Sequence, residues 1–530
     1  MPMPDSFAYD VLEYPSHVHP QMHPSRLAAI ARLHGIAAAS PTDCRLLEVG
    51  CGDGLQLVTL AMAYPRSRFV GVDMSQAAIA RGEAIRARLG LDNLQLVAAD
   101  LLEWNAGPVP YDYIVAHGFY SWVPDFVRER LLALCNQAMA PAGIAYVSYN
   151  ALPGCHIRRM VWEMMKFHAR DIDDPRGKIE HAQGFLAWLG HDALPSKLVY
   201  GEVVRHEARE LLSRTDSSVL FHDDMAAINQ PFLFSEFAAQ ARRHGLAYLA
   251  EADYFEMNDK VLESAEARER LSTLAGDAPL LKEQYLDFLK GRRFRQTLLC
   301  HERIPVQRDP SMPAALEMDV VAQLRAEIPE GTAPDLAAGV AIRFSNADGA
   351  ALVIDHPVAK AALTLVGEAF PGPVAAAELL QSARKLCASD AAVDDDAAVL
   401  AHTLTAAFQM GLLLLHCDAP RFATQAGEHP RTSALAQLQL DTGTDLVTSL
   451  RPSMVRLDSR LALELVRLLD GKRDRTAILH DLSQRMAALP MPDDAGGETF
   501  QPVEWWQQQL AGKLEDGLQQ TARMALLAEE

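Results

Sequence analysis

Short apolar runs alternate with longer segments of helical spacing through residues 45–150. The runs are RLLEVG, RFVGVD, LQLVAAD, YDYIVAH and IAYVSYN, which start at Arg45, Arg68, Leu94, Tyr111 and Ile144. Continuous apolar runs of this length are typical of strands buried on both faces of a parallel sheet. The alternation predicts βαβ units and therefore an α/β fold with a doubly wound sheet.

Helix boundaries can be assigned between these strands. Ser75 is a candidate N-cap directly after the second strand, and Gly90 is a candidate stop for the helix that follows it. Pro124 opens another helix, which we expect to run to the Pro141-Ala142-Gly143 stop. The first domain is therefore expected to span residues 1–305, with its core at 40–150.

The next part of the domain is expected to be a helical insertion and a regulatory region at 151–300. Apolar residues recur at helical spacing from Cys155 to Leu220, as in IRRMVWEMMKFHAR. The segment SEFAAQARRHGLAYLAEADYFEM then predicts a helix, a stop at Gly245 and a strand, and RRFRQTLLCHERI predicts another strand. We expect these two strands to close the sheet as an antiparallel pair.

The chain changes character beyond Pro305. HPVAKAALTLVGEAF, VAAAELLQSARKL, AAVLAHTLTAAFQM and GLLLLHC predict three helices and a strand, an order that resembles a winged helix at 306–425. Its second helix has few basic residues, which favours a protein-interaction role over DNA binding. SRLALELVRLLDGKRDRTAILHDLSQRM predicts two helices around an Asp470-Gly471 turn, within a mostly α-helical domain at 426–530.

Length and composition limit the class of protein. A chain of 530 residues is too long for one hydrophobic core, and 49% hydrophobic with 22% charged residues is the range of folded globular proteins. No apolar run reaches the roughly 18 residues of a membrane helix, and MPMPDSFAYDVLEYPS lacks the features of a signal peptide. We expect a cytoplasmic protein. The seven cysteines never form CxxC, which indicates neither a disulfide framework nor a zinc site.

The net charge lies almost entirely outside the first domain core. Residues 1–170 hold 14 Lys and Arg against 15 Asp and Glu, whereas the whole chain holds 49 against 69 and a net charge of −20. An acidic accessory half repels phosphate backbones, which argues against a nucleic-acid substrate and permits a basic protein partner. The alternative is that the acidity only aids solubility.

The strongest motif is Glu48-Val-Gly50-Cys51-Gly52-Asp-Gly54, between the first strand and LQLVTLAMAY. Glycines allow the backbone to turn sharply and to approach a ligand closely. A nicotinamide-binding loop would have a third glycine five residues after Gly50, where this chain has Leu55. The spacing fits S-adenosylmethionine binding instead, with Glu48 orienting the ammonium of the amino-acid part of the cofactor.

Further candidates for the cofactor site follow the next strands. Asp73 ends the second strand, where a carboxylate can accept hydrogen bonds from the ribose hydroxyls. Asp100 and Leu101 follow the third strand and are candidates for holding the adenine amino group and packing on its ring. Cys51 within the glycine motif, Met74 next to Asp73, and His117 at the end of the fourth strand complete the predicted cofactor set.

Aromatic residues gather after the fourth and fifth strands, at positions that face the ligand crevice of an open α/β sheet. Tyr120, Trp122 and Tyr149 are candidates for a cage around an acceptor that arrives as an ammonium. Ring faces attract cations, and low polarity lowers the pKa of a lysine toward the free amine. His117 and His156 are candidates for moving a proton. The alternative is that these side chains are structural.

Two other kinds of site are disfavoured. The chain lacks an Asn-Pro-Pro-Tyr or Asp-Pro-Pro-Tyr tetrad after the fourth strand, which argues against adenine or glutamine amide methylation. His17, His19 and His23 have prolines between them and no acidic partner, so we expect no metal there. We expect the stretch from Tyr9 to Pro24 to pack over the cofactor mouth instead.

Several segments resemble bacterial methyltransferases that carry a methyltransferase regulatory domain, the group that includes the rickettsial lysine methyltransferases of outer-membrane proteins. They are LLEVGCGDG, YDYIVAHGFYSWVPDFVRERLLALC, GIAYVSYNALPGCHIRRMV, HPSRLAAIARLHGI, NQPFLFSEFAAQARRHGLAYLAEADY, RRFRQTLLCH and LVRLLDGKRDRTAIL. The resemblance implies a Rossmann-like class I methyltransferase domain and winged-helix-like C-terminal parts. It implies S-adenosylmethionine as cofactor, held by Glu48, Gly50, Gly52 and Asp73, and a protein lysine as acceptor.

Three hypotheses follow. The first is an enzyme that methylates lysines of a protein, such as a surface protein before its export, with the acidic half binding a basic segment. The second is a small-molecule methyltransferase whose extra domains serve assembly. The third is a non-catalytic scaffold that has kept the cofactor fold, against which the complete set of cofactor residues argues. Neither nucleic-acid binding nor membrane insertion is expected, and the oligomeric state stays open.

Overall fold

The computed structural model describes residues 12–191, 198–213, 217–260, 262–492 and 498–529. The chain divides into two compact units. The first comprises Met1–Ser16, Ile30–Ala61 and Pro65–Asp309, and the second comprises His17–Ala29, Met62–Tyr64 and Pro310–Glu530. The first unit holds the predicted cofactor residues, and each unit is described by itself.

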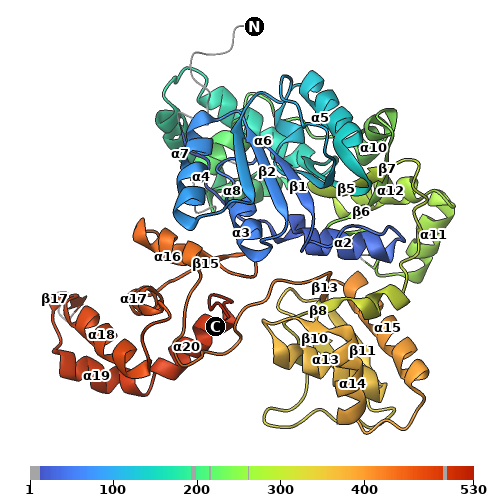
Figure 1. Cartoon of the computed structure of the whole chain (residues 1–530). Coiled ribbons are helices and arrows are strands. Elements are labelled where there is room, and N and C mark those ends of the chain that lie inside the picture. Colours follow the sequence, from blue (N-terminus) through green and yellow to red (C-terminus); the bar gives the residue numbers. More distant parts are fainter. Residues whose placement is uncertain (1–11, 192–197, 214–216, 261, 493–497, 530) are drawn as a thin grey trace. The chain divides into compact units, whose positions relative to one another are not determined.

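A seven-stranded sheet organises the described part of the first unit, in the order β3-β2-β1-β4-β5-β7-β6. Strands β1 to β5 run parallel, and β7 lies antiparallel to both β5 and β6 (Figure 1). The strands are β1 (Arg45–Val49), β2 (Arg68–Asp73), β3 (Leu94–Ala98), β4 (Tyr111–Ala116), β5 (Met139–Asn150), β6 (Leu246–Glu251) and β7 (Phe294–His301). The prediction of a doubly wound α/β sheet closed by an antiparallel pair is confirmed.

The predicted strand positions hold, but β5 begins earlier than expected. The preceding helix ends at Ala138, and the strand starts at Met139 and includes Pro141 and Gly143. The register between β4 and β5 shifts between Tyr111 and Tyr113, which is a bulge. Because a proline cannot donate to the strand ladder, it is tolerated in a strand at such an irregularity. The prediction of a helix continuing to Pro141 was wrong for this reason.

Helices connect the parallel strands, with α4 beside β2 and β3 and α5 beside β5 (Figure 1). The Ser75 hydroxyl accepts a hydrogen bond from the backbone N–H of Ala78, and Gly90 ends α4 with a left-handed φ of 65°. Both predicted boundaries of this helix are confirmed. These connecting elements are α3 (Leu55–Ala63), α4 (Gln76–Leu89), the 3₁₀ turn η2 (Tyr120–Trp122) and α5 (Asp125–Ala138).

A helical insertion follows β5, as predicted. Its helices pack around a core that includes Val161, Trp162, Leu186, Val204 and Leu211. The last element is a π-helix, a rare form that occurs mostly as single turns. The elements are α6 (Cys155–His168), α7 (Pro175–His191), α8 (Val199–Leu212), α9 (Ser217–Val219) and the π-helix η3 (Leu220–Asp224). Residues 192–197 and 214–216 of the predicted insertion lie outside the described residues.

The rest of the first unit holds the antiparallel hairpin β6–β7 and the helices near it. Helix α10 lies against β6 and α12, and Gly245 links α10 to β6 with φ 71°, as the sequence predicted. The elements are α10 (Phe234–Arg243), the 3₁₀ turn η4 (Tyr254–Met257), α11 (Ala265–Ala275) and α12 (Pro279–Lys290).

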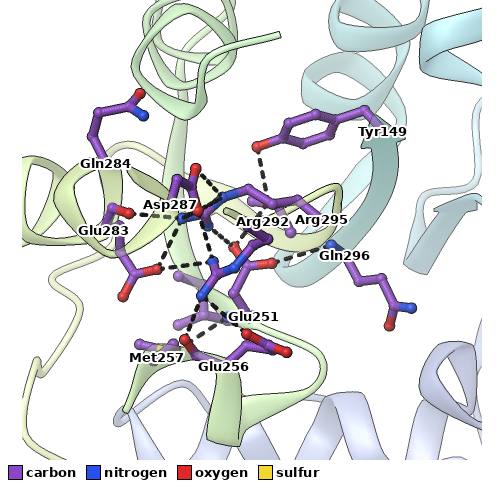
Figure 2. Close-up of polar contacts among 12 residues, drawn as sticks. Tyr149, Glu251, Glu256, Met257, Glu283, Gln284, Asp287, Arg292, Arg295 and Gln296 are labelled. Atoms are coloured by element: carbon purple, nitrogen blue, oxygen red, sulfur yellow. Dashed lines mark hydrogen bonds and ion pairs between the residues drawn. The ribbon is translucent and has the colours of Figure 1, made fainter. Parts of the chain in front are cut away.

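Buried charges join this hairpin to α12 (Figure 2). The Arg295 side chain has no exposed surface and pairs with Glu251, Glu283 and Asp287, the last at 2.9 Å. Arg292 pairs with Glu283 at 3.5 Å and with Asp287 at 3.2 Å. Burial raises the pKa of Glu283 and of Asp287, although the guanidinium of Arg295 opposes this shift. Such a network depends on every partner, since an unpaired buried charge costs several kcal/mol.

The second unit contains the predicted order of helices and a strand between residues 357 and 416, in α13, α14, α15 and β13. Strand β8 pairs antiparallel with β12 and β13. The elements up to residue 416 are η1 (Pro20–Met22), α2 (Pro24–Leu33, whose last turn belongs to the first unit), η5 (Pro313–Glu317), β8 (Asp319–Val321), β9 (Arg325–Ala326), β10 (Ile342–Ser345), β11 (Ala351–Ile354), α13 (Pro357–Ala369), β12 (Val374–Ala375), α14 (Ala376–Leu386), α15 (Val393–Gln409) and β13 (Leu414–His416).

The C-terminal part adds strands that the sequence analysis did not predict. The helices around the Asp470-Gly471 turn are α17 and α18, as expected, but β14 and β15 form a hairpin before them. The elements are α16 (Ala434–Asp441), β14 (Leu446–Thr448), β15 (Met454–Arg456), α17 (Arg460–Leu468), α18 (Arg475–Ala487), β16 (Met491–Pro492), β17 (Glu498–Thr499), α19 (Val503–Ala511) and α20 (Leu514–Arg523). No helix in the described residues is both long and apolar enough to cross a membrane.

Candidate functional site

The loop from β1 to α3 has the conformation that only its glycines adopt easily. Gly50, Gly52 and Gly54 have φ values of 73°, 58° and 74°. Residues with a Cβ pay roughly 1–2 kcal/mol for this left-handed region. The spacing in the sequence therefore reflects three left-handed backbone positions, at alternate residues, after the carboxyl end of β1.

The surroundings of these glycines differ. A Cβ on Gly50 would lie 2.8 Å from the Phe119 ring, and one on Gly54 would lie 2.7 Å from Leu96, so both pack against the protein. A Cβ on Gly52 would meet nothing within 4 Å. The backbone at Gly52 is therefore open for a ligand to approach closely.

Glu48 is buried just before this loop, with 6% of its surface exposed. Its Oε2 is buried and, among the described residues, has no hydrogen-bond partner. Burial, together with the charges of Asp53 and Asp73, raises the pKa of Glu48 to about 8. A buried carboxylate oxygen without a partner is costly, and a cationic ligand group would remove that cost.

Asp73 connects the ends of β1 and β2. Its Oδ2 accepts a hydrogen bond from the Gly52 backbone N–H at 2.9 Å, and its Oδ1 accepts one from the Ser75 N–H at 2.8 Å. These bonds fix the carboxylate beside the open glycine. Each carboxylate oxygen can accept more than one hydrogen bond, so hydroxyl groups of a ligand can still donate to Asp73.

The other predicted cofactor residues lie along the same edge of the sheet. Cys51 is partly buried within the glycine loop, and Met74, next to Asp73, is 39% exposed. Asp100 follows β3 and caps the next turn, where its Oδ1 accepts from the Leu102 N–H at 2.9 Å. Leu101 is buried in the core of the sheet with 4% exposed, so its side chain packs against the protein.

His117 stands at the carboxyl end of β4. Its Nδ1 lies 2.9 Å from the Tyr146 hydroxyl, and its ring lies 5.9 Å from the Phe294 ring. The following turn is held to the end of β5, since the Gly118 N–H donates to Ser148 Oγ at 2.8 Å. The structure therefore brings His117 to the edge of the sheet that carries the glycine loop.

Two of the three aromatic residues predicted to form a cage lie in the core. Tyr120 and Tyr149 have no exposed surface, and their rings pack against Phe237, with Tyr149 stacked at 4.2 Å. The Tyr120 hydroxyl donates to Gln240, and the Tyr149 hydroxyl lies 3.3 Å from the Thr297 hydroxyl. These contacts turn both rings inward, so we assign them to the core and not to a cage.

Trp122 differs from these tyrosines because its ring is only partly buried. Its indole Nε1 has no hydrogen-bond partner among the described residues. An indole N–H usually finds a partner when it is buried. Of the three aromatic candidates, Trp122 is therefore the one that is not packed into the core.

The other histidines considered in the sequence lie away from the glycine loop in the chain or belong to the second unit. His156 lies in the first turn of α6 and is exposed. His17, His19 and His23 belong to the second unit, where His23 Nδ1 lies 2.6 Å from the Ser25 hydroxyl. The described residues contain no group of three or more His, Cys, Asp and Glu side chains arranged to hold a metal.

The sequence analysis missed contacts made by the N-terminal residues. It expected residues 9–24 to pack over the cofactor mouth, of which residues 9–11 lie outside the described residues. Ser16 donates to the Asp53 carboxylate in the glycine loop, and Glu13 pairs with Arg81 of α4 at 3.1 Å. Asp53 was visible in the motif. Its partner Ser16 could not be found from spacing, because the two residues lie 37 positions apart.

The residues of this edge fit S-adenosylmethionine. The cofactor has a cationic amino group, ribose hydroxyls and an adenine ring. The edge offers a Glu48 oxygen that no described residue pairs with, the Asp73 carboxylate and the open backbone at Gly52. These acceptors are therefore complementary to the amino group and the hydroxyls of the cofactor in charge and in hydrogen bonding.

Family models match three stretches of the chain. A methyltransferase domain matches residues 46–143, a predicted methyltransferase regulatory domain matches residues 216–301, and a PKMT C-terminal winged helix domain matches residues 428–526. The winged-helix match falls on the segment for which the sequence predicted mainly helices, and not on residues 306–425.

Two rickettsial proteins are similar to this chain in sequence. The chain is 34% identical over 310 residues to the uncharacterised protein RP789 of Rickettsia prowazekii, a match that covers 58% of this chain and about half, 54%, of that protein. It is 31% identical over 239 residues to protein RP028 of the same organism, covering 45% of this chain and 95% of that protein.

A solved structure matches nearly the whole chain. The structure of PKMT2 from Rickettsia typhi in complex with AdoHcy aligns with a TM-score of 0.84 and 27% identity, covering 97% of this chain and 100% of that one. The match therefore extends over both units.

Proposed function

Since the chain belongs to the bacterial S-adenosylmethionine-dependent methyltransferases that carry a methyltransferase regulatory domain, we propose that it methylates lysine side chains of a protein substrate. The observation that carries the proposal is the presence, in one unit, of the cofactor loop after β1 and of the partly buried Trp122 in the turn η2 that follows β4. The resemblance to the rickettsial lysine methyltransferases supports lysine as the acceptor.

The cofactor residues are assigned by their chemistry. Glu48 accepts hydrogen bonds from the amino group, Asp73 from the ribose hydroxyls, and Gly52 allows the backbone to come close. When bound, S-adenosylmethionine supplies a sulfonium methyl group that a nucleophile can displace in line. The work of the protein is then to align the acceptor and to exclude water.

The acceptor nitrogen must lose its proton before it can attack. An apolar surrounding disfavours the ammonium and so lowers the pKa of a lysine, while a ring face such as that of Trp122 attracts the arriving cation. His117 lies at the same end of β4 and is our candidate for receiving the proton, directly or through water.

The charge distribution supports a basic protein segment as the partner. Residues 1–170 are nearly neutral, and almost all of the net charge of −20 lies in the remainder. An acidic surface attracts a segment rich in lysine at long range and repels nucleic acid. We expect the reaction to take place in the cytoplasm, before any surface protein is exported.

The proposal is tested with tritium-labelled S-adenosylmethionine and a cytosolic lysate of the bacterium that makes this protein. We expect the label in the acid-precipitated protein. Mass spectrometry should then place the added methyl groups on lysine. Label only in the small-molecule fraction would support the alternative of a small-molecule methyltransferase. Cofactor binding without any transfer would support the scaffold.

A further inference from the structure

Residues 12–16 contact elements on two sides of the cofactor loop, and we call them the N-terminal strap. Ser16 donates to the Asp53 carboxylate in the loop itself. Glu13 pairs with Arg81 of α4, the helix that follows Asp73, with 3.1 Å between Oε1 and Nε. The strap is therefore fixed to the elements that carry the glycine loop and the ribose-binding carboxylate.

The other end of the strap is fixed to the π-helix η3. The Nε2 of His222 lies 2.8 Å from the carbonyl oxygen of Leu12, and because a carbonyl only accepts, Nε2 is the donor. The Tyr14 ring meets the His222 ring edge-on at 5.7 Å. His222 is buried with 3% exposed, so the strap covers it.

The next residue of η3 is joined to the end of β5. The Asn229 amide donates to the carbonyl oxygen of Asp223 at 2.7 Å, and its own oxygen accepts from the Asn150 amide at 2.7 Å. Asn150 is the last residue of β5, at the edge of the sheet where the acceptor is expected.

The third residue of this run is joined to the helical insertion. The Asp224 carboxylate has no exposed surface, pairs with Arg158 at 2.6 Å and accepts from the indole N–H of Trp162 at 2.5 Å. Both partners belong to α6. Three consecutive residues of η3 are thus joined to the strap, to the end of β5 through Asn229, and to the insertion. Such π-helical turns are frequent at functional sites.

We propose that η3 couples retention of the cofactor to the acceptor side of the site, with His222 as the positioning residue that holds the strap closed. A displacement of η3 that frees Leu12 also changes the bonds to Asn229 and α6, because the three residues are adjacent. By linkage, an acceptor that binds at the end of β5 then changes the affinity for the cofactor by the same factor by which the cofactor changes the affinity for the acceptor. The inference rests on the proposed function.

The first test is the rate at which S-adenosylhomocysteine leaves the full chain, measured by stopped-flow competition. We expect His222→Phe, which keeps a ring and loses the donor, to release it about fivefold faster. His222→Gln keeps a donor and should release it close to the wild-type rate. His206→Phe changes an exposed histidine of α8 and serves as the matched control.

The decisive test uses Asn229, whose bonds are to Asp223 and Asn150. We expect Asn229→Ala to speed release as well, and the double variant with His222→Phe to be no faster than His222→Phe alone, since the strap is then already open. An unchanged rate in Asn229→Ala, or effects that multiply in the double variant, would overturn the coupling.

Two controls keep the result interpretable. Thermal melting shows whether each variant is folded. Asn229→Asp, which replaces the donor to Asp223 with a charged oxygen and keeps the acceptor for Asn150, replaces Asn229→Ala if the latter does not fold. Wild-type protein that does not bind S-adenosylhomocysteine would count against the proposed function, whereas binding with unchanged release rates in the variants would count against the coupling alone.

Discussion

The backbone N–H of Gly52 donates to the carboxylate of Asp73 over 2.9 Å, and this bond ties the glycine loop after β1 to the end of β2. It places the open backbone of the loop beside a fixed carboxylate at the edge of a parallel sheet. Ligands of open α/β sheets bind at this edge. This bond explains why the glycine loop and Asp73 form one site.

Gly52→Ala should weaken cofactor binding without unfolding the protein. The new methyl group would point into space where nothing lies within 4 Å, and the φ of 58° would cost roughly 1–2 kcal/mol of stability. Gly90→Ala is the matched control, because Gly90 has φ 65°, equally open surroundings and a position at the end of α4. Similar melting temperatures with a loss of calorimetric affinity only in Gly52→Ala are expected. Equal affinities would remove Gly52 from the site.

Glu48 should make both stability and cofactor affinity depend on pH. Its pKa is raised to about 8 in the folded chain, so between roughly pH 4.5 and 8 the folded state holds a proton that the unfolded state has lost. The free energy of unfolding therefore falls as pH rises through this window. Glu48→Gln removes that dependence, and the stability of the variant relative to wild type should grow from pH 5 to pH 8 in urea titrations.

The affinity for the cofactor should rise with pH, whereas the free energy of unfolding falls. The amino group of the cofactor prefers the ionised carboxylate, so binding by the wild type should tighten from pH 6 to pH 8, by at most about tenfold per pH unit. In Glu48→Gln we expect a nearly flat profile in calorimetry over the same range. A wild-type profile as flat as that of the variant would show that Glu48 does not face the cofactor.

Substitutions of Trp122 and of Tyr120 should have different effects, the first on methylation and the second on stability. Trp122→Ala should lower kcat/KM for the protein acceptor by about tenfold, with cofactor affinity unchanged, because a cation–π contact contributes about 1–2 kcal/mol. Tyr120→Phe loses the bond to Gln240 in the core and should lower stability by about 1 kcal/mol without changing kcat/KM. The reverse pattern in a methylation assay would return Tyr120 to the site.

Arg295→Met should destabilise the first unit by about 3–5 kcal/mol. The substitution leaves Glu251, Glu283 and Asp287 buried around a residue without charge. Arg242→Met is the control, because Arg242 pairs with Glu302 at 2.9 Å and both side chains are exposed, by 76% and 45%. Denaturant titration of both variants gives the comparison, and equal losses would mean that burial of the network does not matter.

The sheet could be predicted from the sequence because the patterns that mark its strands and helix ends are local. The apolar runs of β1 to β5, the Ser75 cap and the Gly90 stop each depend on neighbouring residues, and the structure confirms them. The start of β5 was misjudged because its proline lies at a bulge that only the pairing with β4 creates.

The aromatic residues could not be placed from local pattern. Whether Tyr120 and Tyr149 face the crevice or the core depends on Phe237, which lies more than 80 residues away along the chain. The same holds for the pair of Arg295 with Glu251, 44 positions apart, and for the bond between His222 and Leu12, 210 positions apart. Single-sequence patterns carry no information on such pairs.

The measurement that tests the account most directly is calorimetric titration of the wild-type chain and of Asp73→Ala with S-adenosylmethionine and S-adenosylhomocysteine. Asp92→Ala, at an exposed aspartate between α4 and β3, is the control. We predict binding near 1 μM, about −8 kcal/mol, that Asp73→Ala weakens tenfold or more and Asp92→Ala leaves unchanged. Wild-type affinity that is retained in Asp73→Ala, or an intact chain that binds neither compound, would contradict the assignment of this site.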